Sequence, residues 1–169
     1  MDRKELLRKR KNINNREEKE KAIAQAVLPF LKGNVAMYNP IGSEVNILRF
    51  VDYKNSYFPV CLENYQMEFY KYSENQIQGA FQVMEPERIC AIDPDALDVM
   101  IIPMVGFYHC QRVGYGKGYY DRYLERYAGL KIGIAFDEQA LEPFLKKETD
   151  IDMDLVITPT QIIRNDENK

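Results

Sequence analysis

The sequence predicts a single α/β domain in three αβα layers, with a mainly parallel central sheet and helices on both faces. Its 169 residues, 46% of them hydrophobic, suffice for one sizeable core but are few for two. The N-terminal segment has helical periodicity, and after residue 95 short apolar strands alternate with helical or polar segments, an order typical of parallel sheets. No internal repeat or low-complexity linker divides the chain, so residues 1–169 are interpreted as one domain.

The N-terminal helical segment is expected over about residues 2–32. Apolar residues recur there at helical spacing between Leu6 and Phe30. Asp2 is a suitable N-cap, and the NINN segment at 12–15 is expected to divide the segment into two helices. Gly33 is expected to end the second helix.

Short apolar runs predict the strands of the sheet. They lie at 35–38, 57–60, 66–72, 97–102, 131–135 and 155–158, and the run LDVMII at 97–102 is typical of a fully buried strand that stops at Pro103. Further helices are expected from about Glu44 to Tyr53 and from about Gly118 to Tyr127, with the Tyr123 and Tyr127 stripe as core or interface. The polar tail over about 164–169 is expected to fray.

Composition argues against several classes of protein. The 23 basic and 26 acidic residues give a net charge of -3, so any anion site must be local, with no global attraction to nucleic acid or anionic membrane. No apolar run reaches the ~18 residues that a membrane span needs, and the N-terminus lacks an apolar signal region. Cys61, Cys90 and Cys110 have no close pairing, so we expect a reducing cytoplasm rather than disulfides or zinc.

The stretch RVGYGKGYYD at 112–121 is the strongest chemical signal in the sequence. Its three glycines permit positive φ angles and close approach of a ligand to the backbone, and successive N–H groups before a helix favour an anion. The planar guanidinium of Arg112 can bind two phosphate oxygens at once, and Lys117 adds a positive charge on a flexible side chain. Together they suit a triphosphate. The pattern is neither the Walker sequence nor the GxGxxG of dinucleotide-binding folds.

Asp121, just inside the following helix, is a candidate magnesium ligand through bound phosphates. A structural alternative stays open at this point. Glycine-rich turns commonly precede helices, and an aspartate in a first helical turn often serves only as a partner of the helix dipole.

Read as a whole, RVGYGKGYYDRYL resembles the signature RLGYGGGYYDRFL of the 5-formyltetrahydrofolate cyclo-ligase family, also called methenyltetrahydrofolate synthetases. Similar segments follow in order along the chain: KELLR at 4–8, YNPIGSEV at 38–45, FPVCLENYQMEFYKY at 58–72, Ala80–Pro86, LDVMIIPMVGF at 97–107, KIGIAFDEQ at 131–139, and Asp150 with DLVIT. The resemblance implies a Rossmann-like central sheet of the NagB/RpiA/CoA-transferase-like kind.

The resemblance also implies an activity, the ATP- and magnesium-dependent conversion of 5-formyltetrahydrofolate to 5,10-methenyltetrahydrofolate. The γ-phosphoryl group of ATP would activate the formyl oxygen, N10 would attack, and phosphate would leave, with ADP as the other product. The protein would supply positioning and charge stabilisation without a covalent nucleophile. The expected partners are small molecules, without nucleic acid or membrane, and the expected state is a monomer or weak homodimer.

Particular residues receive roles from the resemblance. Arg112 and Lys117 are the catalytic candidates, and Asp121 and Asp150 the magnesium candidates. The expected ATP contacts are Lys4, Arg8, Arg112, Gly114, Gly116, Lys117, Gly118, Tyr119 and Tyr120. The expected folate contacts are Asn39, Glu44, Met67, Phe69, Tyr115 and Tyr119, with the Glu44 carboxylate accepting hydrogen bonds from the pterin and apolar and aromatic groups forming a wall.

Several of these residues also have a structural interpretation. Lys4 and Arg8 are typical of a solvated helix face, Glu44 of a partner for a helix dipole, and Met67 with Phe69 of a core strand. His109, the single histidine, is interpreted as a loop residue beside Cys110 rather than a metal ligand, because no second ligand lies nearby in the sequence.

The resemblance departs from the family pattern just before the glycines. Family members usually carry FDxxGxRLG, whereas FYHCQR at 107–112 is one residue shorter and lacks the aspartate and glycine. A non-catalytic folate- or nucleotide-binding relative is therefore the second hypothesis. A nucleic-acid-binding module draws only on the basic run at 3–11, which glutamates follow at once.

Overall fold

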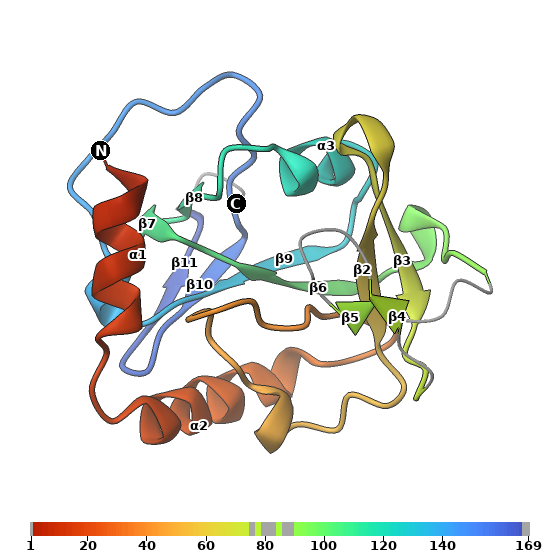
Figure 1. Cartoon of the computed structure of the whole chain (residues 1–169), viewed down its shortest axis with the longest axis horizontal. Helices are drawn as coiled ribbons and strands as arrows, with labels where there is room; N and C mark the ends of the chain where they lie inside the picture. The colour runs from red at the N-terminus through yellow and green to blue at the C-terminus, as the bar shows by residue number, and fades with distance from the viewer. Residues whose placement is uncertain (1, 75–76, 79–83, 86–89, 167–169) are drawn as a thin grey trace.

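The structure, a computed structural model, describes residues 2–74, 77–78, 84–85 and 90–166. A seven-stranded sheet forms its centre (Figure 1). The strands are β1 Val35–Ala36, β2 Tyr57–Cys61, β3 Met67–Lys71, β6 Val99–Pro103, β9 Leu130–Ile134, β10 Leu155–Ile157 and β11 Ile162–Arg164. Their order across the sheet is β11-β10-β9-β6-β1-β2-β3. The neighbours from β10 to β2 run parallel, and β11 and β3 pair antiparallel at the edges, so the prediction of a mainly parallel α/β sheet is confirmed.

The helices cover both faces of the sheet. They are α1 Arg3–Lys11, α2 Arg16–Val27 and α3 Tyr119–Leu124. Successive residues of β6 alternate between two cores, because Ile101 packs in the cluster that contains α2, and Met100 and Ile102 pack in the cluster that contains α3. All five residues of β6 are buried as a result, as expected for a strand covered on both faces.

The expected division of the N-terminal segment is confirmed. The Asp2 side chain accepts a hydrogen bond from the main-chain N–H of Lys4 at 2.9 Å and caps α1. Asn15 takes a left-handed conformation with φ 51° and begins α2 in a new direction. Gly33 has φ 73°, although α2 ends earlier, at Val27, and a short 3₁₀ helix over Leu28–Phe30 precedes this glycine.

The expected helix from Glu44 to Tyr53 is wrong, because only a 3₁₀ turn over Leu48–Phe50 forms there. Side chains satisfy the backbone of this segment instead. Glu44 accepts from the N–H of Ile41, Asn46 accepts from the N–H of Leu48, and the N–H of Asn46 donates to Glu20 of α2. Such local side-chain bonds compete with helix formation.

Smaller differences concern the segments near the predicted ends of elements. The expected helix over 118–127 is shorter, since α3 ends at Leu124, and both Tyr123 and Tyr127 are buried core residues. Part of the expected frayed tail is ordered, because Arg164 pairs with Leu155 in the sheet. Residues 167–169 lie outside the described residues, as does most of the Ala80–Pro86 segment.

Two short hairpins complete the fold. One pairs β4 Ile77–Gln78 with β5 Met84–Glu85, and the other pairs β7 Gly106–Tyr108 with β8 Gln111–Val113. The shortened segment before the glycines is thus a tight hairpin that turns at His109 and Cys110, with His109 exposed and Cys110 buried. No described helix has the length and apolar character that crossing a membrane requires.

Candidate active site

The candidate site lies where β1 and β6 end. The segment 37–46 follows β1, and the β7–β8 hairpin with the glycine turn follows β6. Ligands of open α/β sheets bind in this place, beyond the carboxyl ends of parallel strands. Helix α1 lies beside the hairpin (Figure 1), anchored by Leu6 against Val105 and Val113.

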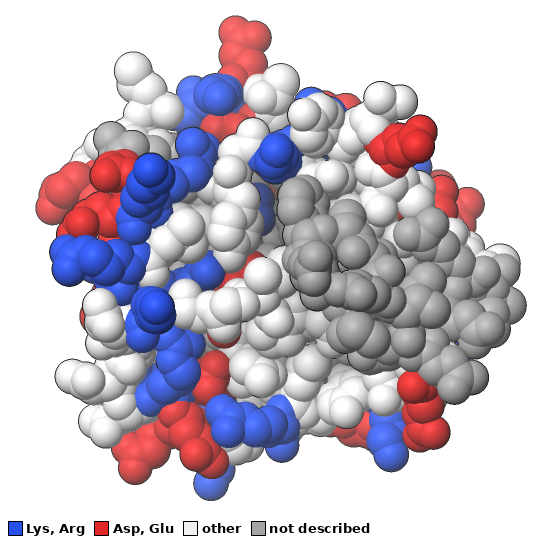
Figure 2. Space-filling view, viewed as in Figure 1, with Lys and Arg blue, Asp and Glu red and all other residues white. Residues whose placement is uncertain are grey.

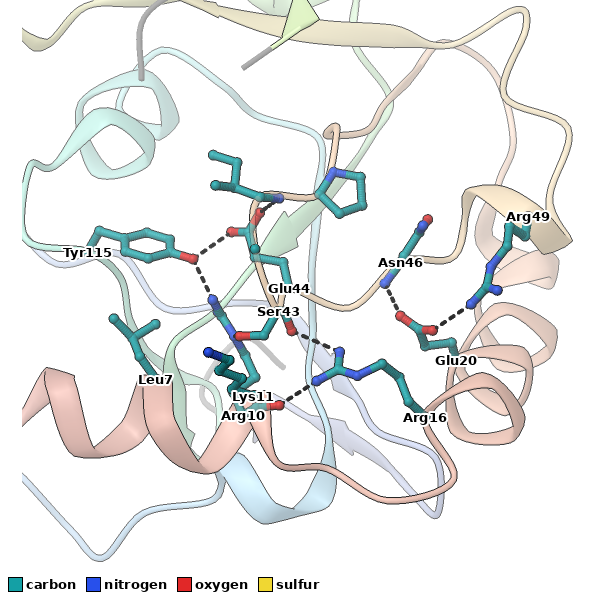
Figure 3. A pocket seen from close by; sticks show the side chains of 13 residues that line it. Leu7, Arg10, Lys11, Arg16, Glu20, Ser43, Glu44, Asn46, Arg49 and Tyr115 are labelled. Carbon is teal, nitrogen blue, oxygen red and sulfur yellow. Dashed lines mark hydrogen bonds and ion pairs between the residues drawn. The ribbon is translucent and has the colours of Figure 1, made fainter. Parts of the chain in front are cut away.

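A cleft of about 790 Å³ opens between the end of α1, the segment 40–46 and Tyr115 (Figure 3). Glu44 lies in its wall and is only 4% exposed. One carboxylate oxygen accepts from the N–H of Ile41 at 2.7 Å, and the other accepts from the Tyr115 hydroxyl at 3.1 Å. Burial raises the pKa of Glu44, and the bond from Ile41 and the charge of Arg10 partly oppose that rise. The structure therefore places Glu44 inside the cleft.

Arg10 is one of the cleft residues that the sequence reasoning missed. Its side chain is buried, at 2% exposure, and it donates to Ser43 Oγ at 2.9 Å, to the Met104 carbonyl at 3.1 Å and to the Tyr115 hydroxyl at 2.7 Å. All three acceptors are neutral. Arg10 follows the buried Leu6 by four residues, so a cation on the apolar face of α1 was the signal in the sequence.

The two α1 residues that were predicted to contact ATP lie elsewhere on this helix. Lys4 is exposed, and Arg8 forms an ion pair with Glu5 in which the Arg8 side chain is 66% exposed. Figure 2 shows Lys and Arg side chains gathered on the side of the molecule where α1 lies. Their contact with ATP stays a prediction.

Arg112 is held rigidly beneath the glycine turn. Its Nε donates to the Pro103 carbonyl at 2.8 Å, and its guanidinium stacks on the Tyr120 ring at 5.0 Å from the centroid. Burial lowers the pKa of Arg112, whereas the nearby Tyr120, Asp121 and Glu44 raise it. A Cβ on Gly114 would lie 2.9 Å from Nη1 of Arg112, so a larger residue there would shift the guanidinium.

The glycine turn has the expected backbone at two positions. Gly116 has φ 96° and Gly118 has φ 75°, and Gly118 is the N-cap of α3. The carbonyl of Gly114 accepts from Arg3 Nε at 2.9 Å, which ties the turn to α1. Arg3 of α1 thus lies beside Gly114 and Gly116, and Arg122 of α3 lies beside Gly118.

Lys117 points toward the turn between β2 and β3. Its Nζ lies 5.9 Å from the centroid of the Tyr65 ring, and the Arg122 guanidinium lies 5.2 Å from the same centroid. Arg122 also donates to the Lys117 carbonyl at 2.7 Å. The Tyr119 ring packs edge-on against Tyr65. Sequence reasoning missed Tyr65, because its spacing carries no signal of this contact.

The magnesium candidates come close to each other through the loop before β10. Asp121 accepts from the N–H of Ile151 at 3.1 Å, and Asp150 accepts from the N–H of Lys147 at 3.0 Å. Burial raises the pKa of Asp121, and the negative charge of the nearby Asp150 adds to this rise. One or two carboxylates completed by phosphate oxygens and water is the ligand set that magnesium commonly uses, so this pair fits the ion. No cluster of three or more potential ligands occurs within the described residues.

The expected folate wall divides into core and cleft residues. Met67 and Phe69 are 2% and 0% exposed and belong to the core that contains α3, where Phe69 packs against Tyr123 at 4.9 Å. Tyr115 is 43% exposed at the cleft. Asn39 is partly exposed and lies in the segment that follows β1. The roles of these residues toward folate stay predictions.

Comparisons with known proteins all point to one family. The model of the 5-formyltetrahydrofolate cyclo-ligase family matches residues 2–159. A 5-formyltetrahydrofolate cyclo-ligase of Mycoplasma genitalium is 34% identical, with 92% of this chain and 94% of the relative covered, and one of Mycoplasma pneumoniae is 35% identical over 92% and 94%.

Solved structures give the same result. A 5,10-methenyltetrahydrofolate synthetase from Mycoplasma pneumoniae superposes with a TM-score of 0.74 at 29% identity, covering 93% of this chain and 96% of that one. The synthetase of Aquifex aeolicus superposes with a TM-score of 0.80 at 31% identity, over 96% and 90%. These matches over nearly the whole chain show that the protein belongs to the 5-formyltetrahydrofolate cyclo-ligase family.

Proposed function

We propose that the protein converts 5-formyltetrahydrofolate to 5,10-methenyltetrahydrofolate, with ATP and magnesium, by phosphoryl activation of the formyl oxygen. The names of the relatives support this substrate. The observation in this chain that carries the proposal is the presence of two guanidinium groups near Glu44, the buried Arg10 and the partly buried Arg112. Buried charge costs several kcal/mol unless it is compensated; Arg10 donates to neutral atoms, and the nearby Glu44 carboxylate, which both guanidinium groups share, compensates only part of their charge. A polyphosphate would supply the compensating charge.

The proposed reaction needs positioned positive charge rather than a nucleophile on the protein. A bond forms between the formyl oxygen and the γ-phosphorus while the β–γ bridge breaks, and ADP is released. N10 then attacks the formyl carbon and releases its proton to solvent, the carbon–oxygen bond breaks, and phosphate leaves. Arg10, Arg112 and the N–H groups of the glycine turn would stabilise the phosphoryl charge, and Lys117 would contact the phosphates from the rim. Asp121 and Asp150 would hold magnesium, which supplies further positive charge to the phosphates.

The folate half of the site is proposed around Glu44. An ionised carboxylate only accepts hydrogen bonds, so it suits the N–H donors of a pterin. Asn39, Tyr115 and Tyr119 are the proposed neighbours of the ring. Met67 and Phe69 would support it from the core beneath, and Lys4 and Arg8 would meet the outer part of ATP. Tyr120, stacked on Arg112, would hold that guanidinium against the phosphates.

The test is formation of the methenyl chromophore in the near ultraviolet from 5-formyltetrahydrofolate, ATP and magnesium. Arg112→Lys keeps the positive charge but loses the planar guanidinium that can donate two hydrogen bonds to one phosphate. We therefore expect kcat/KM to fall about tenfold to a hundredfold. Arg164→Lys, in edge strand β11, is the matched control and should retain full activity. Binding of both ligands by folded wild-type protein without any product would instead identify a non-catalytic relative, the alternative that the shortened hairpin suggested.

A further inference from the structure

The Tyr115 hydroxyl lies between the two halves of the proposed site. It accepts a hydrogen bond from Arg10 Nη2 at 2.7 Å and donates one to Glu44 at 3.1 Å, as Figure 3 shows. We infer that this hydroxyl is a positioning group that couples the nucleotide half to the folate half, by linking a phosphate-facing guanidinium to the pterin-facing carboxylate. The inference rests on the proposed function and assigns to Tyr115 a role beyond a place in an aromatic wall.

The chemistry of the phenol suits such a link. A hydroxyl that accepts from a cation becomes a stronger donor, because hydrogen bonds in a chain polarise one another in a poorly solvated site. Arg10 and Glu44 are both buried, so little water competes with these bonds. A ligand that draws Arg10 toward itself therefore changes the bond that Glu44 receives.

The ring of Tyr115 also makes a contact that does not involve the hydroxyl. The Arg10 guanidinium lies 5.6 Å from the ring centroid, and the residue is 43% exposed at the rim of the cleft. Tyr115→Phe should therefore retain the fold and the ring while removing both hydrogen bonds. This variant separates a polar coupling role from a stacking role.

Several elements place charged or titratable groups around Glu44, and together they set its protonation. They are Arg10 of α1, Arg112 of β8, Tyr115 of the glycine turn, Tyr120 of α3 and Tyr38 after β1. Of these, Tyr115 donates a hydrogen bond to the carboxylate and so favours its ionised form. Losing that donor raises the pKa of Glu44, so the acidic limb of the kcat/KM profile should move to higher pH in Tyr115→Phe.

The experiment measures binding of 5-formyltetrahydrofolate by calorimetry, with and without a non-hydrolysable ATP analogue and magnesium, and the pH profile of turnover. In wild-type protein the analogue should change the folate Kd about fivefold or more. In Tyr115→Phe this factor should approach one, kcat/KM should fall about tenfold to a hundredfold, and the acidic limb should shift. An absent coupling in wild type, an unchanged coupling factor in the variant, or an unmoved acidic limb overturns the inference.

Tyr127→Phe is the matched control. Tyr127 is a buried tyrosine whose hydroxyl donates to the Leu130 carbonyl at 2.7 Å, away from the cleft. It should lower the melting temperature and leave the coupling and the pH profile unchanged. Failure of wild-type protein to form the methenyl product counts against the proposed function. Normal wild-type turnover, with the coupling factor and the acidic limb unchanged in Tyr115→Phe, counts against this inference alone.

Discussion

Glu44 is a buried carboxylate whose cost to the fold depends on pH. Its pKa is raised, chiefly by burial, so the folded state favours the protonated form more than the unfolded state does. The contribution of Glu44 to stability is therefore present at low pH and lost as pH rises through the raised pKa. Ionisation of Glu44 therefore costs the fold stability.

Glu44→Gln tests this balance. We expect the variant to lose product formation yet to be as stable as wild type, or more stable, at neutral pH, because no charge is buried. The difference in unfolding free energy, wild type minus variant, should grow as pH falls, and denaturant unfolding at several pH values measures it. An equal loss of stability at every pH would show that Glu44 serves the fold instead.

Arg10 shows what residue patterns alone leave undecided. The run RKELLRKRK predicts a helix that carries several cations. Arg8 and Arg10 nevertheless lie on different sides of that helix. The Arg8 side chain is 66% exposed, whereas Arg10 is only 2% exposed. The family resemblance pointed to Glu44 and Arg112, and the structure places Glu44 in the wall of the cleft; the roles of both residues stay predictions. The resemblance did not show which α1 cation enters the cleft, because that depends on how Leu6 docks against β8.

The turn between β2 and β3 carries strain at the element scale. Asn64 and Tyr65 both have φ 58°, a left-handed conformation that asparagine tolerates and an aromatic residue adopts at a cost of order 1 kcal/mol. Tyr65 is nevertheless placed against Lys117 and Arg122. The position of this ring points to a role in holding the glycine turn.

Tyr65→Asn should separate strain from function. We expect the unfolding free energy to stay level or rise by up to about 1 kcal/mol, because asparagine fits the backbone. The KM for ATP should rise about two- to fivefold, since Lys117 loses a cation–π partner. Asn64→Gly, in the same turn, is the control and should leave the KM for ATP unchanged. An unchanged KM in Tyr65→Asn would show that Tyr65 does not contribute to ATP binding.

The elements themselves were predicted from sequence with uneven success, for identifiable reasons. The strands after residue 95 were found because burial on both faces leaves continuous apolar runs, as in β6. The false helix at 44–53 arose because apolar spacing there resembles a helix, whereas Glu44 and Asn46 bond to nearby main-chain N–H groups. Strand β11 was missed because its exposed face and polar tail resemble a frayed end.

At the scale of the whole molecule, ligands should tie separate segments together. A bound nucleotide would bridge α1, the glycine turn and the loop that carries Asp150, and a ligand at a hundred times its Kd stabilises a fold by about 2.7 kcal/mol. We expect ATP to raise the melting temperature and magnesium to raise it further. In Asp121→Asn, ATP should still raise the melting temperature, but magnesium should no longer raise it further.

Asp152→Asn is the control for this thermal experiment. Asp152 lies two residues after Asp150 and pairs with Lys146 at 2.9 Å, so the change removes one nearby charge without touching either magnesium candidate. This variant should keep both increments. If it loses the magnesium increment as Asp121→Asn does, general negative charge rather than a defined ligand pair attracts the ion.

The docking of α1 also bears on how the protein is made. Arg10 and Tyr115, hydrogen-bonded across the cleft, are 105 residues apart in the chain. At synthesis rates of about 5–20 residues per second, α1 leaves the ribosome roughly 5–20 s before its partner is made. A nascent chain can thus complete the cleft only after residue 115 has been made. Until then Leu6 lacks its packing partners Val105 and Val113. The lysines and arginines around Leu6 keep α1 hydrated during that time.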